Sequence, residues 1–130
     1  ALDVFAAAGI ADVPVVARDL NDVDSAADGA RELLEAHPDL TAILCTTDSM
    51  ALGVLEYCRG RRRVPEELSV TGFDGIGVDG LSTVAQPTQR KGETAAMLLR
   101  AAMNGRPQRQ ERIILPTQYL PGRTVREPAR

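Results

Sequence analysis

Residues Val64 to Pro87, VPEELSVTGFDGIGVDGLSTVAQP, hold two short apolar runs on either side of a glycine-rich turn. The first run, Leu68 to Phe73, is followed by Asp74, and the second ends in Gln86 and Pro87. Short apolar runs between turn residues are typical of strands that are covered on both faces. A carboxylate directly after such a strand is a candidate ligand contact, and an aspartate before a glycine is also a common turn former.

Strand and helix patterns alternate along the rest of the chain. Further short apolar runs predict strands at Val13 to Ala17, Thr41 to Cys45, Thr83 to Ala85, Arg112 to Leu115 and Gln118 to Leu120. Apolar residues at helical spacing predict helices at about 26–36, 49–59 and 89–103, with Ser25 and Asp48 as N-caps of the first two. This alternation predicts an α/β fold with an open parallel sheet and flanking helices.

Acidic residues follow three of the predicted strands. Asp19 and Asp24 come after the first strand, Thr47 and Asp48 after the second, and Asp74 after the third. Because ligands of open α/β sheets bind beyond the carboxyl ends of the strands, these side chains are expected to share one site. Carboxylates accept hydrogen bonds, which suits the hydroxyls of a polyol or an amine ligand. Each residue also has a structural alternative: Asp48 as a helix N-cap, and Asp19 and Asp24 as solvated loop residues.

Composition excludes several classes of protein. The chain has 130 residues and a formal net charge of -3, so it fits one globular domain with no general attraction to nucleic acid. Its longest apolar runs are far too short to cross a bilayer. Cys45 and Cys58 lack metal-ligand spacing and are expected to be buried free thiols of a reducing compartment, so no metal and no cofactor is predicted.

Motifs for catalysis or nucleic-acid binding are also missing. His37, the only histidine, precedes Pro38 at the end of a predicted helix, and no nucleophile-elbow, zincin or P-loop spacing is present. We therefore expect no enzyme. The basic cluster of residues 59–63 follows a predicted helix directly, which favours a solvated helix end that complements the helix dipole.

Five short motifs in order carry a resemblance to a known family. They are AILCTTDSMALG, VPEELSVTGFD, LSTVAQP, ILP and GRT, at residues 42–53, 64–74, 81–87, 114–116 and 122–124. This ordered set resembles the C-terminal part of the effector-binding domain of LacI-type (LacI/GalR family) transcriptional regulators. The resemblance implies a type I periplasmic-binding-protein-like fold of two lobes, in which a small molecule in the cleft controls the affinity of a helix-turn-helix domain for operator DNA.

The resemblance also implies roles for single residues. Asp74 matches the family's ligand-binding carboxylate, Thr47 and Asp48 match a strand-exit pair, and Gln86 matches a crossing-strand position. Asp24 falls where sugar-binding members often carry an aromatic ring, which weakens the expectation of a sugar over other polar metabolites.

The implied domain division places the C-terminal lobe at about 1–82 and 117–126, and assigns segment 86–115 to the N-terminal lobe. The family's Arg-x-x-Gly ligand motif, most of the N-terminal lobe and the DNA-binding domain are expected to precede Ala1. A homodimer is implied, with Leu52, Leu55 and Glu56 at its interface. Leu55 also fits a core position. We further expect the 130-residue chain by itself to associate, because segment 86–115 would lack its partners.

The function predicted from the sequence is thus ligand sensing and dimerisation in a cytoplasmic regulator. The alternative is the periplasmic sugar-binding component of an ABC-type uptake system, which shares the two-lobed fold. A small α/β enzyme is a third possibility, and it would need an activity that depends on Asp48 or Asp74.

Overall fold

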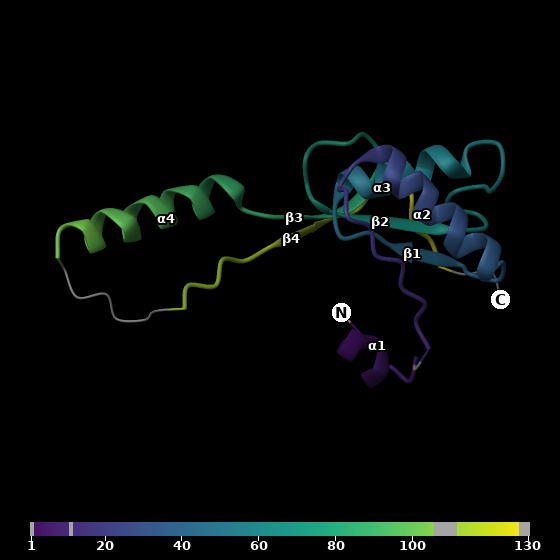
Figure 1. Cartoon of the computed structure of the whole chain (residues 1–130), viewed down its shortest axis with the longest axis horizontal. Helices are drawn as coiled ribbons and strands as arrows, with labels where there is room; N and C mark the ends of the chain where they lie inside the picture. The colour runs from purple at the N-terminus through teal and green to yellow at the C-terminus, as the bar shows by residue number, and fades with distance from the viewer. Residues whose placement is uncertain (1, 11, 106–111, 128–130) are drawn as a thin grey trace.

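The computed structural model describes residues 2–10, 12–105 and 112–127. Its elements in chain order are α1 (Leu2–Ala7), α2 (Val23–Ala36), β1 (Ala42–Leu44), α3 (Asp48–Cys58), β2 (Ser69–Asp74), β3 (Ser82–Ala85), α4 (Thr88–Met103) and β4 (Gln118–Leu120). The strands form one sheet in the order β1-β2-β3-β4 (Figure 1). The expected α/β class is confirmed. The sheet is mixed, however, because β1, β2 and β3 are parallel whereas β4 returns antiparallel to β3.

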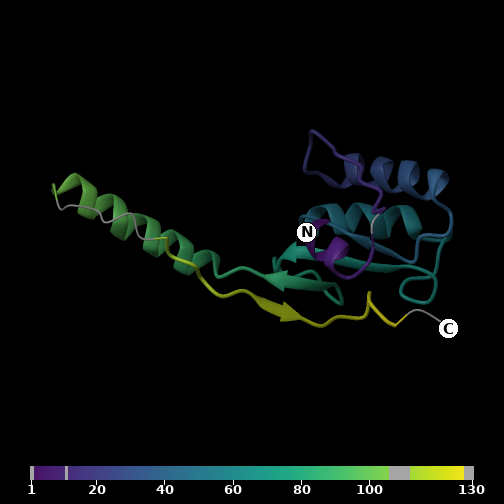
Figure 2. The same ribbon diagram turned by 90° about the horizontal axis from the view of Figure 1, so that it is seen from below.

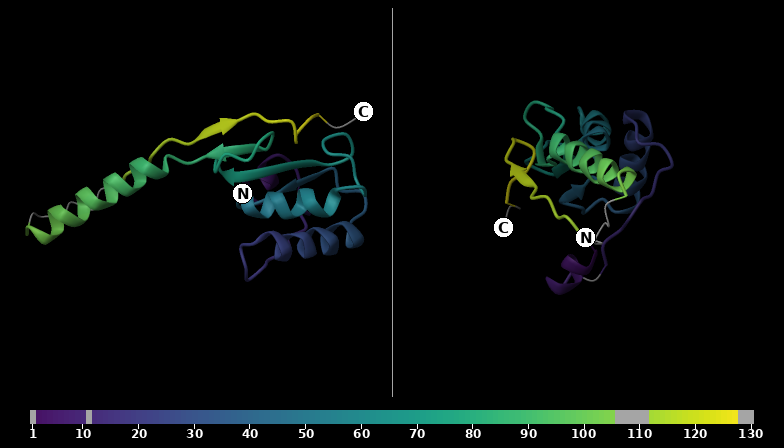
Figure 3. Two further views of the ribbon diagram at one scale, coloured as in Figure 1. Left: turned by 90° about the horizontal axis from the view of Figure 1, so that it is seen from above. Right: turned by 90° about the vertical axis from the view of Figure 1, so that its left-hand side faces the viewer.

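Residues 23–85 form a layered unit that we call the body. Helix α3 lies against the sheet and α2 packs on α3, so that both helices are on the same side of the sheet (Figures 2 and 3). The core between these layers is made of small and branched apolar side chains: Ala30, Leu34, Ile43, Cys45, Ala51, Val54, Cys58, Leu68, Val70 and Leu81. Leu68 and Val70 are fully buried.

The two body helices start one to three residues earlier than predicted. The Asp22 carboxylate accepts a hydrogen bond from the Ser25 amide at 2.7 Å and caps α2, and the Thr47 hydroxyl accepts one from the Met50 amide at 3.1 Å and caps α3. Ser25 and Asp48 were therefore wrong as N-caps. In each case the capping residue lies three positions before the amide that it binds, which is the usual capping distance.

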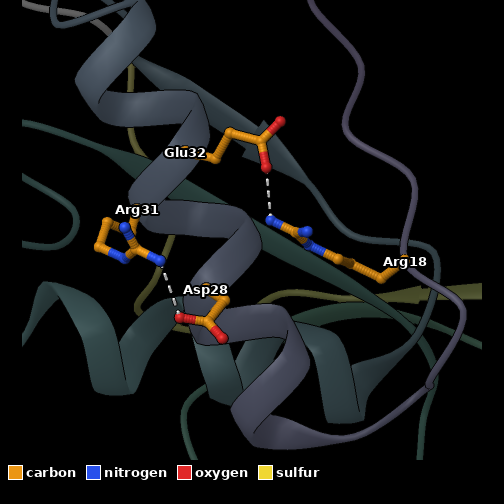
Figure 4. Close-up of polar contacts among 4 residues, drawn as sticks. All are labelled: Arg18, Asp28, Arg31 and Glu32. Atoms are coloured by element: carbon orange, nitrogen blue, oxygen red, sulfur yellow. Dashed lines mark hydrogen bonds and ion pairs between the residues drawn. The ribbon is translucent and has the colours of Figure 1, made fainter.

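Val13 to Ala17 is not a strand. None of the described residues pairs with it in a β-ladder, so its apolar run lacks the hydrogen-bond partner that a strand requires. The end of this segment is held to α2 by an ion pair of 2.7 Å between Arg18 Nη2 and Glu32 Oε2, and Arg31 pairs with Asp28 along the same helix at 3.2 Å (Figure 4).

Helix α4, which we call the arm, extends away from the body (Figure 1). None of its residues is buried, and Met97, Leu99 and Met103 are all more than 60% exposed. Arg112 to Leu115, predicted as a strand, is likewise unpaired among the described residues. The chain then returns to the body through β4, where Gly122 passes so close to the backbone of Gly80 and Leu81 that a side chain would overlap it.

Candidate functional site

The carboxyl ends of the parallel strands define one edge of the body. The loop before α2, the start of α3 and the end of β2 lie together at this edge (left panel of Figure 3). β3 also ends here and continues into α4. The acidic residues predicted from the strand exits are therefore brought to the same side of the molecule, as expected for an open α/β sheet.

Asp48 is buried beneath this edge. Its side chain is fully buried, and its Oδ2 accepts hydrogen bonds from the amides of Gly75 and Ile76, both at 2.8 Å. Its Oδ1 accepts a hydrogen bond from the Thr83 hydroxyl. Three donors within the protein thus occupy the carboxylate, so in this structure Asp48 fixes the turn after β2 and presents no free oxygen surface to a ligand.

Asp74 occupies the turn that Asp48 holds. Its backbone has a φ of 123°, the only positive value among the described residues other than glycine. Residues with a side chain rarely adopt this conformation, and it is maintained only where the surroundings impose it. Gly75 follows with a φ of 75°, and a Cβ there would lie 2.7 Å from the Cα of Ala85. A bulkier residue at Gly75 would therefore displace β3 or the turn.

A chain of hydrogen bonds connects Asp74 to the start of the arm. Gln86 Nε2 donates to Asp74 Oδ1 at 2.7 Å, and Lys91 Nζ donates to Gln86 Oε1 at 2.7 Å. The Gln86 amide proton also donates to the Asp74 carbonyl at 3.1 Å. These bonds fix the orientation of the Gln86 amide group, because its nitrogen faces a carboxylate and its oxygen faces an ammonium group.

An open pocket of about 770 Å³ lies beside this chain. It is lined by the turn after β2, the end of β3 and the first turn of the arm: Asp74, Gly75, Ile76, Gln86, Pro87, Thr88, Gln89, Arg90 and Lys91. Asp74 and Gln86, two of the predicted ligand residues, are among them. Sequence reasoning missed Arg90 and Lys91, although two adjacent cations shortly after the Gln-Pro pair were a visible signal.

Thr47 and Asp24 do not line this pocket. The Thr47 hydroxyl donates a hydrogen bond to Asn21 Oδ1 at 2.6 Å while it caps α3. Asp24 is exposed in the first turn of α2, where a carboxylate is favoured by the helix dipole. The structure thus brings Asp74 and Gln86 together and leaves Thr47 and Asp24 elsewhere on the same edge.

The residues predicted for a dimer interface lie on α3. Leu55 is half-buried and packs against the core, Leu52 is half-buried, and Glu56 is exposed with an ion pair of 3.0 Å to Arg59. Leu55 therefore has a packing role in the body whatever else it contacts.

The two thiols are buried and free. Burial raises the pKa of Cys45 to about 12, so this thiol stays protonated and unreactive at neutral pH. No group of metal-ligating side chains occurs within the described ranges 2–10, 12–105 and 112–127, and none of the helices described there could span a membrane.

Comparison with known proteins defines the class of this fold. The model of the periplasmic binding protein-like domain matches residues 2–125. A LacI-family regulator structure from Corynebacterium glutamicum superposes with a TM-score of 0.83 at 41% identity, covering 95% of this chain and 38% of that one. A LacI-family regulator from Arthrobacter in complex with lactose superposes with a TM-score of 0.80 at 30% identity, covering 95% and 48%.

Curated relatives agree with the structures. The transcriptional regulator IpsA of Corynebacterium glutamicum is 41% identical over 96% of this chain and 36% of its own length, and the ribose operon repressor of Bacillus subtilis is 32% identical over 75% and 32%. The chain thus spans about a third of the length of these relatives. It belongs to the periplasmic binding protein-like domain family and, within it, to the effector-binding domains of LacI-type regulators. The alternative of an uptake-system component is not favoured, because these relatives are regulators.

Proposed function

We propose that this chain forms part of the effector-sensing domain of a transcriptional repressor. In this proposal a small polar molecule binds beside Asp74 and controls operator binding by a helix-turn-helix domain elsewhere in the protein. The observation that carries the proposal is the Asp74–Gln86–Lys91 hydrogen-bond chain, because it connects the body to the arm and its three residues line a pocket. A ligand that replaces one of these hydrogen bonds would change how strongly the orientation of the arm is fixed relative to the body.

The pocket also has the polarity that a hydroxylated ligand needs. Asp74, Gln86, Thr88 and Gln89 offer acceptors and donors, and the strained backbone at Asp74 is the kind of feature that concentrates at binding sites. Sugar ligands are named for similar structures, namely lactose for the Arthrobacter regulator and cellobiose for CelR, which is 29% identical with a TM-score of 0.79. Thr47 and Asp24 would join the site only if a second lobe closed over this edge.

We propose further that the arm and segment 112–115 belong to that second lobe. Ile114 is 75% exposed and Leu99 is 63% exposed, which leaves apolar surface with no contact inside the described chain to bury it. In the full-length protein this surface packs against the rest of the lobe, and the protein is a cytoplasmic homodimer that uses α3, including Leu52 and Glu56. By itself the 130-residue chain would associate through the arm and bind effector weakly, because it forms only one wall of the site.

The test uses the full-length protein in a reporter strain that carries its operator. We expect Asp74→Ala to abolish the response to effector while operator binding, measured by gel shift, is unchanged. Asp79→Ala is the matched control, because Asp79 lies in the same loop, is 95% exposed and is absent from the pocket lining. A normal response in Asp74→Ala, with the control also normal, would refute the role of Asp74.

A further inference from the structure

The pocket beside Asp74 carries more positive than negative charge. Three of its nine lining residues carry a formal charge, namely Asp74, Arg90 and Lys91, which gives a formal net charge of +1. The chain as a whole has a net charge of -3, so the pocket departs in sign from the rest of the protein. A local excess of cations in a concave site attracts anions.

Neither cation forms an ion pair with a carboxylate of the described residues. Five ion pairs connect arginines to acidic residues in the described parts of the chain, and none of them includes Arg90 or Lys91. Lys91 donates to the neutral amide oxygen of Gln86, and an ammonium group has three donors. The nearest acidic neighbour in the helix, Glu93, accepts a hydrogen bond from Gln89 instead, at 2.9 Å.

Asp74 supplies the opposite chemistry in the same pocket, with the Gln86 side-chain amide between its Oδ1 and Lys91 Nζ. Its Oδ1 accepts from Gln86, and no described residue donates to its Oδ2. This free carboxylate oxygen can accept a hydroxyl hydrogen from a ligand, whereas it would repel an anion. The pocket therefore offers both an acceptor for hydroxyl groups, at Asp74, and cations for a negatively charged group, at Arg90 and Lys91.

The pocket lining formed by the described residues offers no aromatic surface for stacking on a neutral sugar ring. The apolar lining residues are Ile76 and Pro87, and the lining contains no aromatic side chain. The whole chain has no Trp, two Tyr and two Phe. The contacts that this wall of the site offers to a ligand are therefore polar and charged, and hydrogen bonds to charged groups are the stronger kind.

We propose that the effector is an anionic polyol, whose hydroxyls bind Asp74 and Gln86 and whose carboxylate or phosphate binds Arg90 and Lys91. This inference rests on the function proposed above and names the ligand class of the same site. Arg90 and Lys91 are then specificity-determining residues, since they distinguish the acid from its neutral parent.

The experiment is calorimetric titration of the full-length protein with matched sets of polyols. Each set contains a neutral parent, its sugar acid and its phosphate: glucose, gluconate and glucose 6-phosphate; ribose, ribonate and ribose 5-phosphate; inositol and inositol 1-phosphate. We expect an anionic member of at least one set to bind at least about tenfold more tightly than its parent, and the acid and phosphate arms identify the anionic group. The difference should shrink as salt is raised, because both cations are exposed.

Three variants and one control assign the effect to the pocket. Arg90→Gln and Lys91→Gln should each weaken binding of the anionic ligand about fivefold to tenfold, and Lys91→Arg should retain most of it. Arg100→Gln, which removes a cation at the far end of the same helix and outside this pocket, should leave affinity unchanged.

The outcomes separate this inference from the function on which it rests. A neutral parent that binds as tightly as its acid and phosphate, with binding lost in Asp74→Asn, would overturn the anionic class and leave the sensing function standing. Failure of every set to bind would also overturn it, while the reporter test of Asp74→Ala judges the sensing function independently.

Discussion

The body and the arm are built from the same kinds of residues but differ in what those residues contact. Helix α3 buries Ala51, Val54 and Cys58 against the sheet and α2, whereas the longer α4 buries no residue at all. An isolated helix of this length is marginal in water, since most helix stability in proteins comes from packing an apolar face. The comparison shows one part that forms its own core and another that buries none of its residues, with the pocket at the junction between them.

The largest contrast is expected from removing one leucine in each part. Leu68→Ala in the body should lower the free energy of unfolding by about 3 to 4 kcal/mol, because Leu68 is fully buried and its loss leaves a cavity. Leu99→Ala in the arm should change it by about 0.5 kcal/mol or less, since Leu99 is 63% exposed. Urea denaturation followed by circular dichroism measures both changes in the free energy of unfolding. Equal losses would break the distinction between body and arm.

The next effect concerns the attachment of the pocket turn to the body. Asp48→Asn places an amide group against three donors, from Gly75, Ile76 and Thr83, and should cost about 3 kcal/mol. In the full-length protein it should also weaken the effector response, because the turn that carries Asp74 loses its anchor. Asp39→Asn is the control, as Asp39 is exposed and is not a candidate ligand residue. A variant as stable as the wild type would show that Asp48 does not hold this turn.

A smaller contrast comes from glycine in the two helices. Gly53→Ala in α3 should destabilise the chain by about 2 kcal/mol, because a Cβ there overlaps the Val23 carbonyl oxygen where α2 crosses α3. Gly92→Ala in α4 meets open space and should stabilise the helix by about 0.5 to 1 kcal/mol. Thermal unfolding of the two variants shows directly whether each substitution raises or lowers the stability. Destabilisation by Gly92→Ala would indicate that the arm is packed.

The smallest effect is a pH dependence of the stability that comes from Cys45 in the body. The folded state keeps Cys45 protonated, with its pKa raised from 9.0 to about 12, so this stabilisation is complete below pH 9 and is lost as pH rises toward 12. Between pH 8 and pH 10 the wild type should lose about 1 kcal/mol more than Cys45→Ala. The comparison of the two proteins removes the contribution of other groups. Identical pH curves would contradict a buried neutral thiol.

The sequence pattern predicted most elements of the body correctly. These elements pack against one another, so their apolar residues recur at the spacing of the buried face. It was wrong for Val13 to Ala17 and Arg112 to Leu115, which have strand-like composition but no described strand beside them. A strand depends on a partner that may be distant in sequence, and composition does not reveal whether that partner is present.

Part of the candidate site was predictable in the same way. Asp74 and Gln86 follow strands that the pattern identifies, so their common edge could be expected. The role of Asp48 could not, because its three donors come from a turn and a strand at 27 to 35 residues' distance along the chain. The place of Lys91 in the pocket could not be predicted either, because it depends on the direction in which α4 continues from β3.

Hydrogen exchange measured by mass spectrometry on the 130-residue chain tests the central distinction most directly, at a concentration where light scattering shows a monomer. We predict that amides of β2 and α3 exchange only through opening of the whole body, and that amides of α4 exchange at least about 100-fold faster. Protection of α4 equal to that of α3 in the monomer would contradict the account, because it would show that the arm has a core of its own.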